Sequence, residues 1–171
     1  MSVPEIVEAA PVHDELLYRI YAESRSEELD AWGWGEVERE AFLRMQYELR
    51  RRSYAMQVPA AEHSVIVWNG APVGHLIVEE GDGSIRIIYV ALLAACRNQG
   101  IGSRLIASLQ QKAAKAGKTV VLSVDAANHR ARRLYERLGF RPIRHSIPYL
   151  WMEWMADEQA MVLHDGERTD R

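Results

Sequence analysis

The sequence predicts an α/β domain with a mixed, mostly antiparallel central sheet of about six to seven strands and about four flanking helices. Two observations indicate this class. Three short β-branched runs follow one another between residues 64 and 92 and are separated by turn sequences, which is typical of an antiparallel meander. A continuous apolar run at Thr119–Val124 stands between two helical patterns, which is typical of a strand buried on both faces.

The N-terminal part of the chain predicts one strand and two amphipathic helices. Residues Pro4–Ala9 are partly β-branched and favour a short strand. Apolar residues recur at three- and four-residue steps over His13–Ser24 and again over Glu36–Arg52, so each segment has one apolar face. Between them, Glu28–Gly35 carries two tryptophans and two glycines, and we interpret it as a mobile loop.

The meander is defined by its turns. Asn69-Gly70 is a strong hairpin signal between the strands predicted at His63–Trp68 and Val73–Glu80. A Gly-Asp-Gly sequence at residues 81–83 then turns the chain into a third strand at Ile85–Leu92.

Helix and strand alternate in the second half of the chain. A helix follows the glycine-containing turn at residues 97–102 and ends at Gly117. After the buried strand, Asn128 caps a further helix that ends at Gly139. The two last strands are predicted at Phe140–Ile143 and Ile147–Trp154.

Length and composition limit the class of protein. A chain of 171 residues with 48% hydrophobic content can form one domain without disulfides, and we expect this domain at 1–156 and a flexible tail at 157–171. The net charge of -3 argues against nucleic acid as a partner, despite the basic sequence Arg130-x-Arg132-Arg133. Cys96 is the only cysteine, which favours a reducing, cytoplasmic location. No apolar run is long enough to span a membrane, so no membrane partner is expected.

The residues Arg97–Ser103 join a predicted strand to a helix in a way that suits a diphosphate. The first backbone N–H groups of a helix have no partner inside it, and the helix dipole adds partial positive charge there. Glycines at 100 and 102 let a ligand approach the backbone, and Arg97 or Arg104 can supply counter-charge. By itself the pattern is equally typical of a tight turn without a ligand. It lacks the Gly-Lys-Ser/Thr of a nucleotide P-loop and the three glycines of a dinucleotide site.

Two motifs in this order and spacing resemble the GCN5-related N-acetyltransferase (GNAT) family. The first is Arg97-x-x-Gly100-x-Gly102 after a strand. The second follows about thirty residues later and reads Ala126-x-Asn128-x-x-Ala131-x-x-Leu134-Tyr135-Glu136-x-Leu138-Gly139-Phe140. The likeness of the predicted elements covers roughly Val3 to Met155. It implies the acyl-CoA N-acyltransferase fold, whose sheet is splayed between the strands predicted at Ile85–Leu92 and Thr119–Val124.

The resemblance implies acetyl-coenzyme A (acetyl-CoA) as co-substrate and assigns residues to it. In the family, the amides of the turn hold the diphosphate, the end of the preceding strand pairs with the pantetheine arm, and an asparagine and a tyrosine lie near the arm and its sulfur. The residues so assigned are Val90, Ala91, Leu92, Arg97, Asn98, Gln99, Gly100, Ile101, Gly102, Ser103, Asn128 and Tyr135.

The implied reaction is direct transfer of the acetyl group to an amine in a ternary complex. We expect the main-chain N–H of Leu92 to polarise the thioester carbonyl and Tyr135 to protonate the departing sulfur. Positions 128 and 135 are two helical turns apart and therefore share one face of the helix. Without the resemblance, Asn128 is equally well a helix cap and Tyr135 equally well a core aromatic.

The general base is where the sequence departs from the family. Many relatives carry an acidic residue on the central strand, where this chain has Arg86-Ile87-Ile88-Tyr89. The substitutes are Glu79, Glu80, Asp125 and His75, each of which is more often a solvated edge residue or a turn former. The missing carboxylate leaves an alternative open, namely a non-catalytic acyl-CoA-binding sensor or interaction module.

The acceptor is expected to be a small-molecule or peptide amine that contacts aromatic side chains near the thioester. The candidates are Trp32, Trp34, Tyr89 and Tyr149. Trp151 and Trp154 are alternatively core or dimer-contact residues, which leaves a homodimer open. We interpret Arg50-Arg51-Arg52 as a solvated helix end. The six histidines show no metal-ligand spacing, so no metal is expected.

Overall fold

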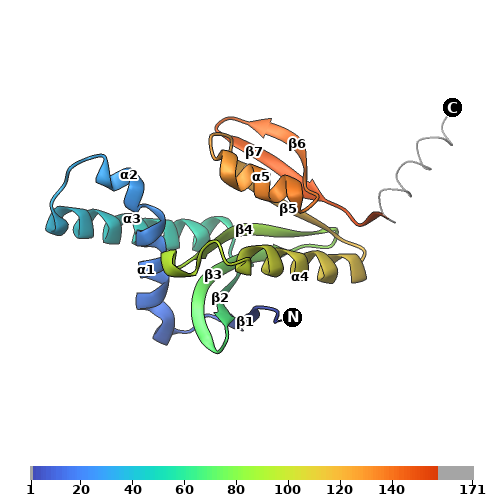
Figure 1. Ribbon diagram of the computed structural model, residues 1–171, viewed down its shortest axis with the longest axis horizontal. Helices are drawn as coiled ribbons and strands as arrows, with labels where there is room; N and C mark the ends of the chain where they lie inside the picture. The colour runs from blue at the N-terminus through green and yellow to red at the C-terminus, as the bar shows by residue number, and fades with distance from the viewer. Residues whose placement is uncertain (1, 158–171) are drawn as a thin grey trace. The chain divides into compact units, whose positions relative to one another are not determined.

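The computed structural model describes residues 2–157 and has the predicted α/β architecture (Figure 1). The helices are α1 (Asp14–Ser24), α2 (Ser26–Asp30), α3 (Glu36–Gln57), α4 (Ile101–Lys115) and α5 (His129–Arg137), with 3₁₀ turns at Pro11–His13 and Ala94–Cys96. The strands are β1 (Glu5–Glu8), β2 (Glu62–Trp68), β3 (Ala71–Glu80), β4 (Ser84–Leu92), β5 (Thr119–Asp125), β6 (Arg141–Ser146) and β7 (Tyr149–Trp154). They form a mixed sheet of order β1-β2-β3-β4-β5-β7-β6, which confirms the predicted fold class. From residue 158 on, the predicted tail lies outside the described residues.

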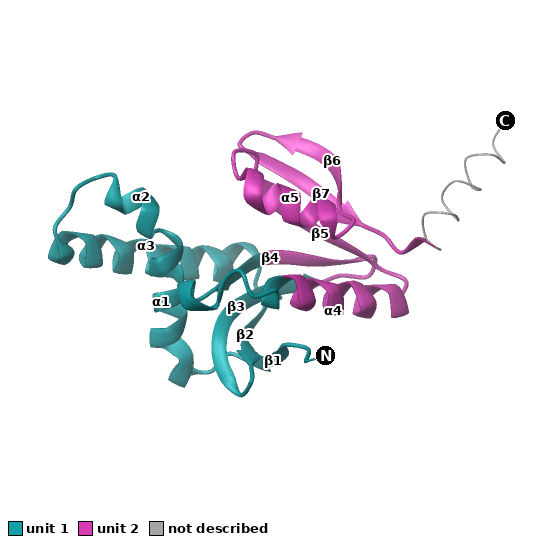
Figure 2. Cartoon of the chain, viewed as in Figure 1, with its two compact units in different colours: residues 1–79, 89–102 teal, residues 80–88, 103–171 magenta. Residues whose placement is uncertain are grey.

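The chain clusters into two compact units (Figure 2). The first comprises residues 1–79 and 89–102, and it contains β1 to β3 with α1 to α3. The second comprises residues 80–88 and 103–171, and it contains β5 to β7 with α5 and most of α4. The strand β4 belongs to the second unit as far as Ile88 and to the first unit from Tyr89.

In the first unit, β1 and β2 pair antiparallel, and β2 and β3 form the predicted hairpin. Asn69 and Gly70 both have positive φ, at 51° and 77°. A two-residue type I′ turn requires positive φ at both central positions, so the sequence Asn-Gly fixes this hairpin. The register shifts between Ile66 and Val67, which marks a bulge.

The helices of the first unit bury a core that includes part of the segment interpreted as a loop. Tyr18 and Tyr21 of α1 pack with Leu29 of α2 and Leu43 of α3. The prediction of a mobile loop at Glu28–Gly35 is therefore wrong at its N-terminal end, because Leu29 is buried with only 1% of its surface exposed. Glutamates in the first turn of α2 also complement its dipole.

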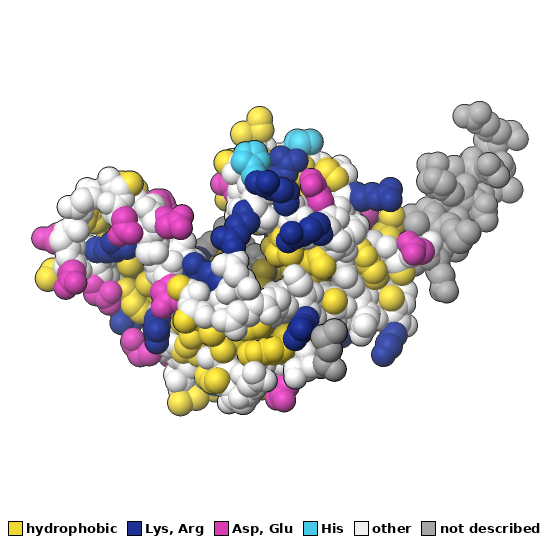
Figure 3. Space-filling model, viewed as in Figure 1, with side chains coloured by type: hydrophobic (Ala, Val, Ile, Leu, Met, Phe, Trp, Pro, Cys, Tyr) yellow, Lys and Arg dark blue, Asp and Glu magenta, His cyan; other side chains and the backbone are white. Residues whose placement is uncertain are grey.

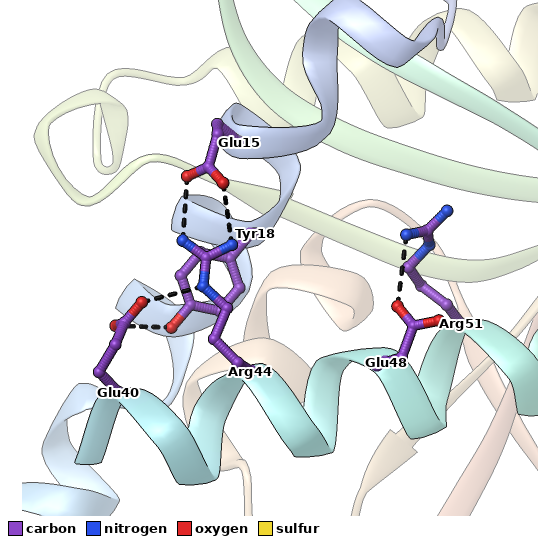
Figure 4. Close-up of polar contacts among 6 residues, drawn as sticks. All are labelled: Glu15, Tyr18, Glu40, Arg44, Glu48 and Arg51. Atoms are coloured by element: carbon purple, nitrogen blue, oxygen red, sulfur yellow. Dashed lines mark hydrogen bonds and ion pairs between the residues drawn. The ribbon is translucent and has the colours of Figure 1, made fainter. Parts of the chain in front are cut away.

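A polar network ties α1 to α3 (Figure 4). The Arg44 guanidinium donates to both carboxylate oxygens of Glu15, at 2.9 and 3.1 Å, and to Glu40 at 2.9 Å. The Tyr18 hydroxyl donates to the other oxygen of Glu40 at 2.8 Å. Burial, and then the hydrogen bond to Glu40, raise the pKa of Tyr18 to about 12. The Arg44 guanidinium also stacks over the Tyr18 ring at 3.6 Å, so this network orients the two helices.

In the second unit, β5 pairs parallel with the start of β4 and antiparallel with β7. The apolar side chains of β5 alternate in exposure: Val120, Leu122 and Val124 are buried, whereas Val121 is only half-buried. The prediction of a strand buried on both faces is therefore wrong for this strand. Apolar side chains pair across β5 and β7, with Leu122 opposite Met152, and they form part of the core.

Candidate active site

The turn before α4 has a backbone conformation that few sequences allow. Asn98 and Gly100 both have positive φ, at 63° and 79°, and α4 begins directly afterwards at Ile101. A Cβ atom built on Gly100 or Gly102 would meet no other atom within 4 Å, so open space lies against both glycines. The Gln99 side chain stabilises the turn by donating to the Ala95 carbonyl at 2.9 Å. The turn thus presents backbone at a helix start without side-chain obstruction, as a diphosphate requires.

The end of β4 leads into this turn with its main chain oriented by two contacts. The Leu93 N–H donates to the Val73 carbonyl on β3 at 2.8 Å. Successive N–H groups of a strand point to opposite edges, so the N–H of Leu92 points away from β3. The Arg97 Nε donates to the Leu92 carbonyl at 3.3 Å. The parallel register of β4 with β5 covers only Ser84 to Ile87, so the part of β4 that carries Val90, Ala91 and Leu92 continues past it.

Asn128 and Tyr135 lie in the second unit on α5. The Asn128 side-chain oxygen accepts from the Ala131 N–H at 3.1 Å and caps the helix. This bond uses only the carbonyl oxygen of the Asn128 side chain, and the side-chain NH₂ group takes no part in it. The Tyr135 ring makes an edge contact with Phe140, with centroids 5.7 Å apart. Burial raises the pKa of Tyr135, so its hydroxyl stays protonated around neutral pH.

The aromatic residues that were predicted to contact the acceptor lie in three separate parts of the structure. Trp32 and Trp34 lie 5.2 Å apart in the first unit, both pack against Phe42, and both are nearly half exposed. Tyr89 also lies in the first unit, but its ring is covered by Arg50. Tyr149 is half exposed at the start of β7 in the second unit.

The candidate general bases are mostly engaged in other contacts. Glu80 accepts from Lys112 at 2.8 Å and Lys118 at 2.9 Å, and these bonds lower its pKa to about 2. Asp125 accepts from the Ala127 N–H at 2.9 Å and acts as a turn former. His75 is buried, and desolvation lowers its pKa to about 3. The contacts of Glu80 and Asp125 therefore do not support either carboxylate as the base.

The interpretation of Arg50-Arg51-Arg52 as a solvated helix end is wrong. The helix α3 continues to Gln57, and Arg50 is half-buried over tyrosine rings, whereas the side chain of Arg52 is 72% exposed. The spacing of Tyr47, Arg50 and Tyr54 at three- and four-residue steps would have placed them on one face of the helix.

The described residues show neither a metal-binding cluster nor a membrane-spanning helix. No group of three or more His, Cys, Asp or Glu side chains within residues 2–157 is arranged to hold a metal ion. None of the helices in that range combines the length and apolar character needed to cross a membrane.

Comparison with known proteins identifies the family. A model described as the acetyltransferase (GNAT) family matches residues 16–140, which is most of the chain. The chain therefore belongs to the GNAT acetyltransferase family, and the predicted family is confirmed. A sequence comparison with curated proteins finds no match.

Solved structures of acetyltransferases share the fold at low sequence identity. The PaiA N-acetyltransferase of Thermoplasma acidophilum in complex with coenzyme A has a TM-score of 0.64 and 18% identity, over 91% of this chain and 100% of that one. Ard1 of Thermoplasma volcanium has a TM-score of 0.58 and 20% identity, over 91% and 100%. A GNAT acetyltransferase of Elizabethkingia anophelis with acetyl-CoA bound has a TM-score of 0.54 and 15% identity, over 61% and 82%. These findings agree with acetyl-CoA as the predicted co-substrate.

Proposed function

We propose that this chain transfers the acetyl group of acetyl-CoA to an amine by direct attack in a ternary complex. The observation that carries the proposal is the turn before α4. Its left-handed residues Asn98 and Gly100 lead into the helix start, and open space lies against Gly100 and Gly102. The amides of Gln99 to Ser103 would hold the diphosphate, as at other helix N-termini that bind phosphate.

Electrostatics support an anionic ligand for both units. Lys and Arg side chains gather over α5 (Figure 3), the helix that carries Tyr135. The sequence of α5 contains Arg130, Arg132, Arg133 and Arg137. In the first unit, Arg97 follows the 3₁₀ turn at Ala94–Cys96 and stands at the entry to the turn before α4. A ligand with several phosphate charges matches these groups.

In the proposed reaction, the main chain of β4 and Tyr135 have separate tasks. Val90, Ala91 and Leu92 pair with the pantetheine arm, and the Leu92 N–H polarises the thioester carbonyl as negative charge develops on its oxygen. Tyr135 donates its proton to the departing thiolate, a role that its raised pKa favours. Asn128 contacts the arm through its side-chain NH₂ donors.

The acceptor is proposed to contact four aromatic residues, of which Trp32, Trp34 and Tyr149 are exposed. Trp32, Trp34, Tyr89 and Tyr149 are proposed to contact a small-molecule or peptide amine by burial and cation–π interaction. The amine is deprotonated through water or arrives neutral, since the candidate carboxylates Glu80 and Asp125 are engaged elsewhere. With one cysteine in the sequence, we propose a cytoplasmic location.

The absence of an assigned base favours one second candidate, a non-catalytic acyl-CoA-binding sensor. Thiol release from acetyl-CoA, measured with a panel of amines, polyamines, amino acids and peptides, separates the two. The enzyme proposal predicts amine-dependent release that saturates with at least one acceptor class. Binding of acetyl-CoA without release from any member of the panel would instead favour the sensor.

A further inference from the structure

A cavity of about 390 Å³ lies within the first unit and has no part in the proposed acetyl transfer. It is bounded by the C-terminal half of α3, the connection from β1 to α1, and residues of β2 and β3. Its volume falls in the range of roughly 300 to 1,000 Å³ that is typical of small-molecule sites. Its apolar and aromatic walls include Leu17, Tyr47, Tyr54 and Ile77.

One of the residues that line the cavity is a buried histidine, His75. His75 has only 5% of its surface exposed, and its Nε2 atom is fully buried and unpartnered among the described residues. The neighbouring Tyr89 ring lies 5.4 Å away, and its hydroxyl is also buried without a partner within residues 2–157. His75 is one of the residues that line the cavity, so a ligand bound there would change the surroundings of its imidazole ring.

A cation stands at the same place without an anionic partner. The Arg50 guanidinium lies over the rings of Tyr89 at 3.8 Å, Tyr21 at 4.9 Å and Tyr54 at 5.2 Å. No carboxylate of the described part of the chain forms an ion pair with it. Ring contacts cover the faces of a guanidinium and leave the N–H groups at its edges, which are suited to two parallel bonds to a carboxylate.

Besides Arg50, the lining of the cavity carries one further arginine and one acid. Arg51 also lines it and pairs with Glu48 at 3.4 Å, and Asp14 is the single acid in its lining. His63 lies 5.8 Å from His75, and both rings add polar edges without a fixed charge. The cavity therefore combines a guanidinium that has no ion pair among the described residues with aromatic and aliphatic walls.

We propose that this cavity binds a small aromatic carboxylate. The carboxylate pairs with the Arg50 guanidinium, and the ring packs between Tyr54 and the aliphatic wall at Leu17 and Ile77. Binding needs only residues of the first unit, so the proposal holds whether or not the chain transfers acetyl groups.

The test uses 4-hydroxyphenylacetate as probe and calorimetric titration of the full chain. Wild-type protein is expected to bind it in the micromolar to low millimolar range. Arg50→Gln should weaken binding by about tenfold or more, because it removes a charge-assisted bidentate bond. Arg52→Gln is the matched control on the same helix, since Arg52 does not line the cavity, and it should keep the wild-type affinity.

Two further measurements hold even if Arg50→Gln folds poorly. The neutral analogue 4-hydroxyphenylacetamide should bind wild-type protein at least about tenfold more weakly than the acid, because it cannot form the ion pair. The imidazole resonances of His75 should shift on titration with the acid, whereas those of exposed His145 should not. Equal affinity for acid and amide, no binding of the acid, or an unshifted His75 would each overturn the proposal.

Discussion

Replacing His75 by phenylalanine should remove an acid-dependent loss of stability. His75 lies on β3 with its ring against Tyr89 and His63, and burial, then the nearby His63 and Arg50, lower its pKa from 6.5 to about 3. The folded state therefore binds fewer protons than the unfolded state between these two values. The titration of His75 leaves the unfolding free energy unchanged above about pH 6.5 and lowers it as the pH drops towards about 3.

The size of the effect follows from linkage. A pH of about 5 is about 1.5 pH units below the unfolded pKa, and each unit corresponds to about 1.4 kcal/mol. The folded pKa of about 3 is well below that pH, so His75 should cost about 2 kcal/mol of unfolding free energy relative to neutral pH. Phenylalanine keeps a ring in the same contacts and does not titrate.

The measurement is urea unfolding, followed by circular dichroism, at several values between about pH 7.5 and about pH 5. The difference in unfolding free energy between His75→Phe and wild type should change by about 2 kcal/mol in favour of the variant over this range. His145→Phe removes an exposed imidazole and serves as control. Parallel pH curves for His75→Phe and wild type would refute the reasoning, because His75 would then titrate alike in both states.

Three other substitutions test separate parts of the account. Tyr135→Phe should lower kcat by about tenfold and change coenzyme A affinity by less than about twofold, because its proton is needed only as the thiolate leaves; an unchanged kcat in steady-state kinetics would remove it from the mechanism. Glu80→Gln should cost up to about 1 kcal/mol at neutral pH, given the partial exposure of its ion pairs. Because the pKa of Glu80 is lowered to about 2, the difference in unfolding free energy between variant and wild type is at its full size above about pH 4.5. In denaturation curves it should vanish as the pH falls through about 2, and a difference that persists there would contradict the ion pairs of Glu80 as its cause. Arg44→Met removes the contacts that Arg44 makes with Glu15 and Glu40 in Figure 4, and it should lower stability by about 1 kcal/mol and Tm by about 2 to 4 °C in calorimetry. An unchanged Tm would show that these contacts contribute nothing.

Local chemistry explains the parts of the fold that could be predicted from the sequence. The hairpin at Asn69-Gly70 and the turn at Asn98–Gly100 need positive φ, which these residue types adopt most readily. The cap at Asn128 and the helix stop at Gly139 follow from similar short-range rules. Each signal is contained within a few residues, so no knowledge of distant contacts was needed.

Features that depend on distant partners were missed. Arg50 belongs to a basic sequence typical of a solvated helix end, and besides Tyr54 of its own helix it contacts tyrosines of α1 and β4, which its sequence neighbours do not reveal. The helix α2 is too short for apolar periodicity, and it is ordered because Leu29 is buried against α1 and α3. Both cases are tertiary effects, which sequence spacing along one element does not contain.

The central claim is that the main chain at the start of α4 holds the diphosphate of coenzyme A. Gly102→Glu tests it, since open space at this position accommodates a side chain. Replacing a glycine within a helix stabilises the fold by up to about 1 kcal/mol, so the substitution should not lower Tm. An acidic side chain near the start of a helix also complements the helix dipole, which adds up to about 1 kcal/mol of stability. The uncharged Gly102→Gln has nearly the same size and separates the effect of charge from that of bulk.

The deciding measurement is calorimetric titration of coenzyme A into wild type and both variants, with Tm recorded in parallel. The account predicts clear binding to wild type, affinity lowered by about tenfold or more in Gly102→Glu with Tm unchanged or raised, and a smaller loss in Gly102→Gln. No binding to wild type, or equal affinity in wild type and Gly102→Glu, would contradict it.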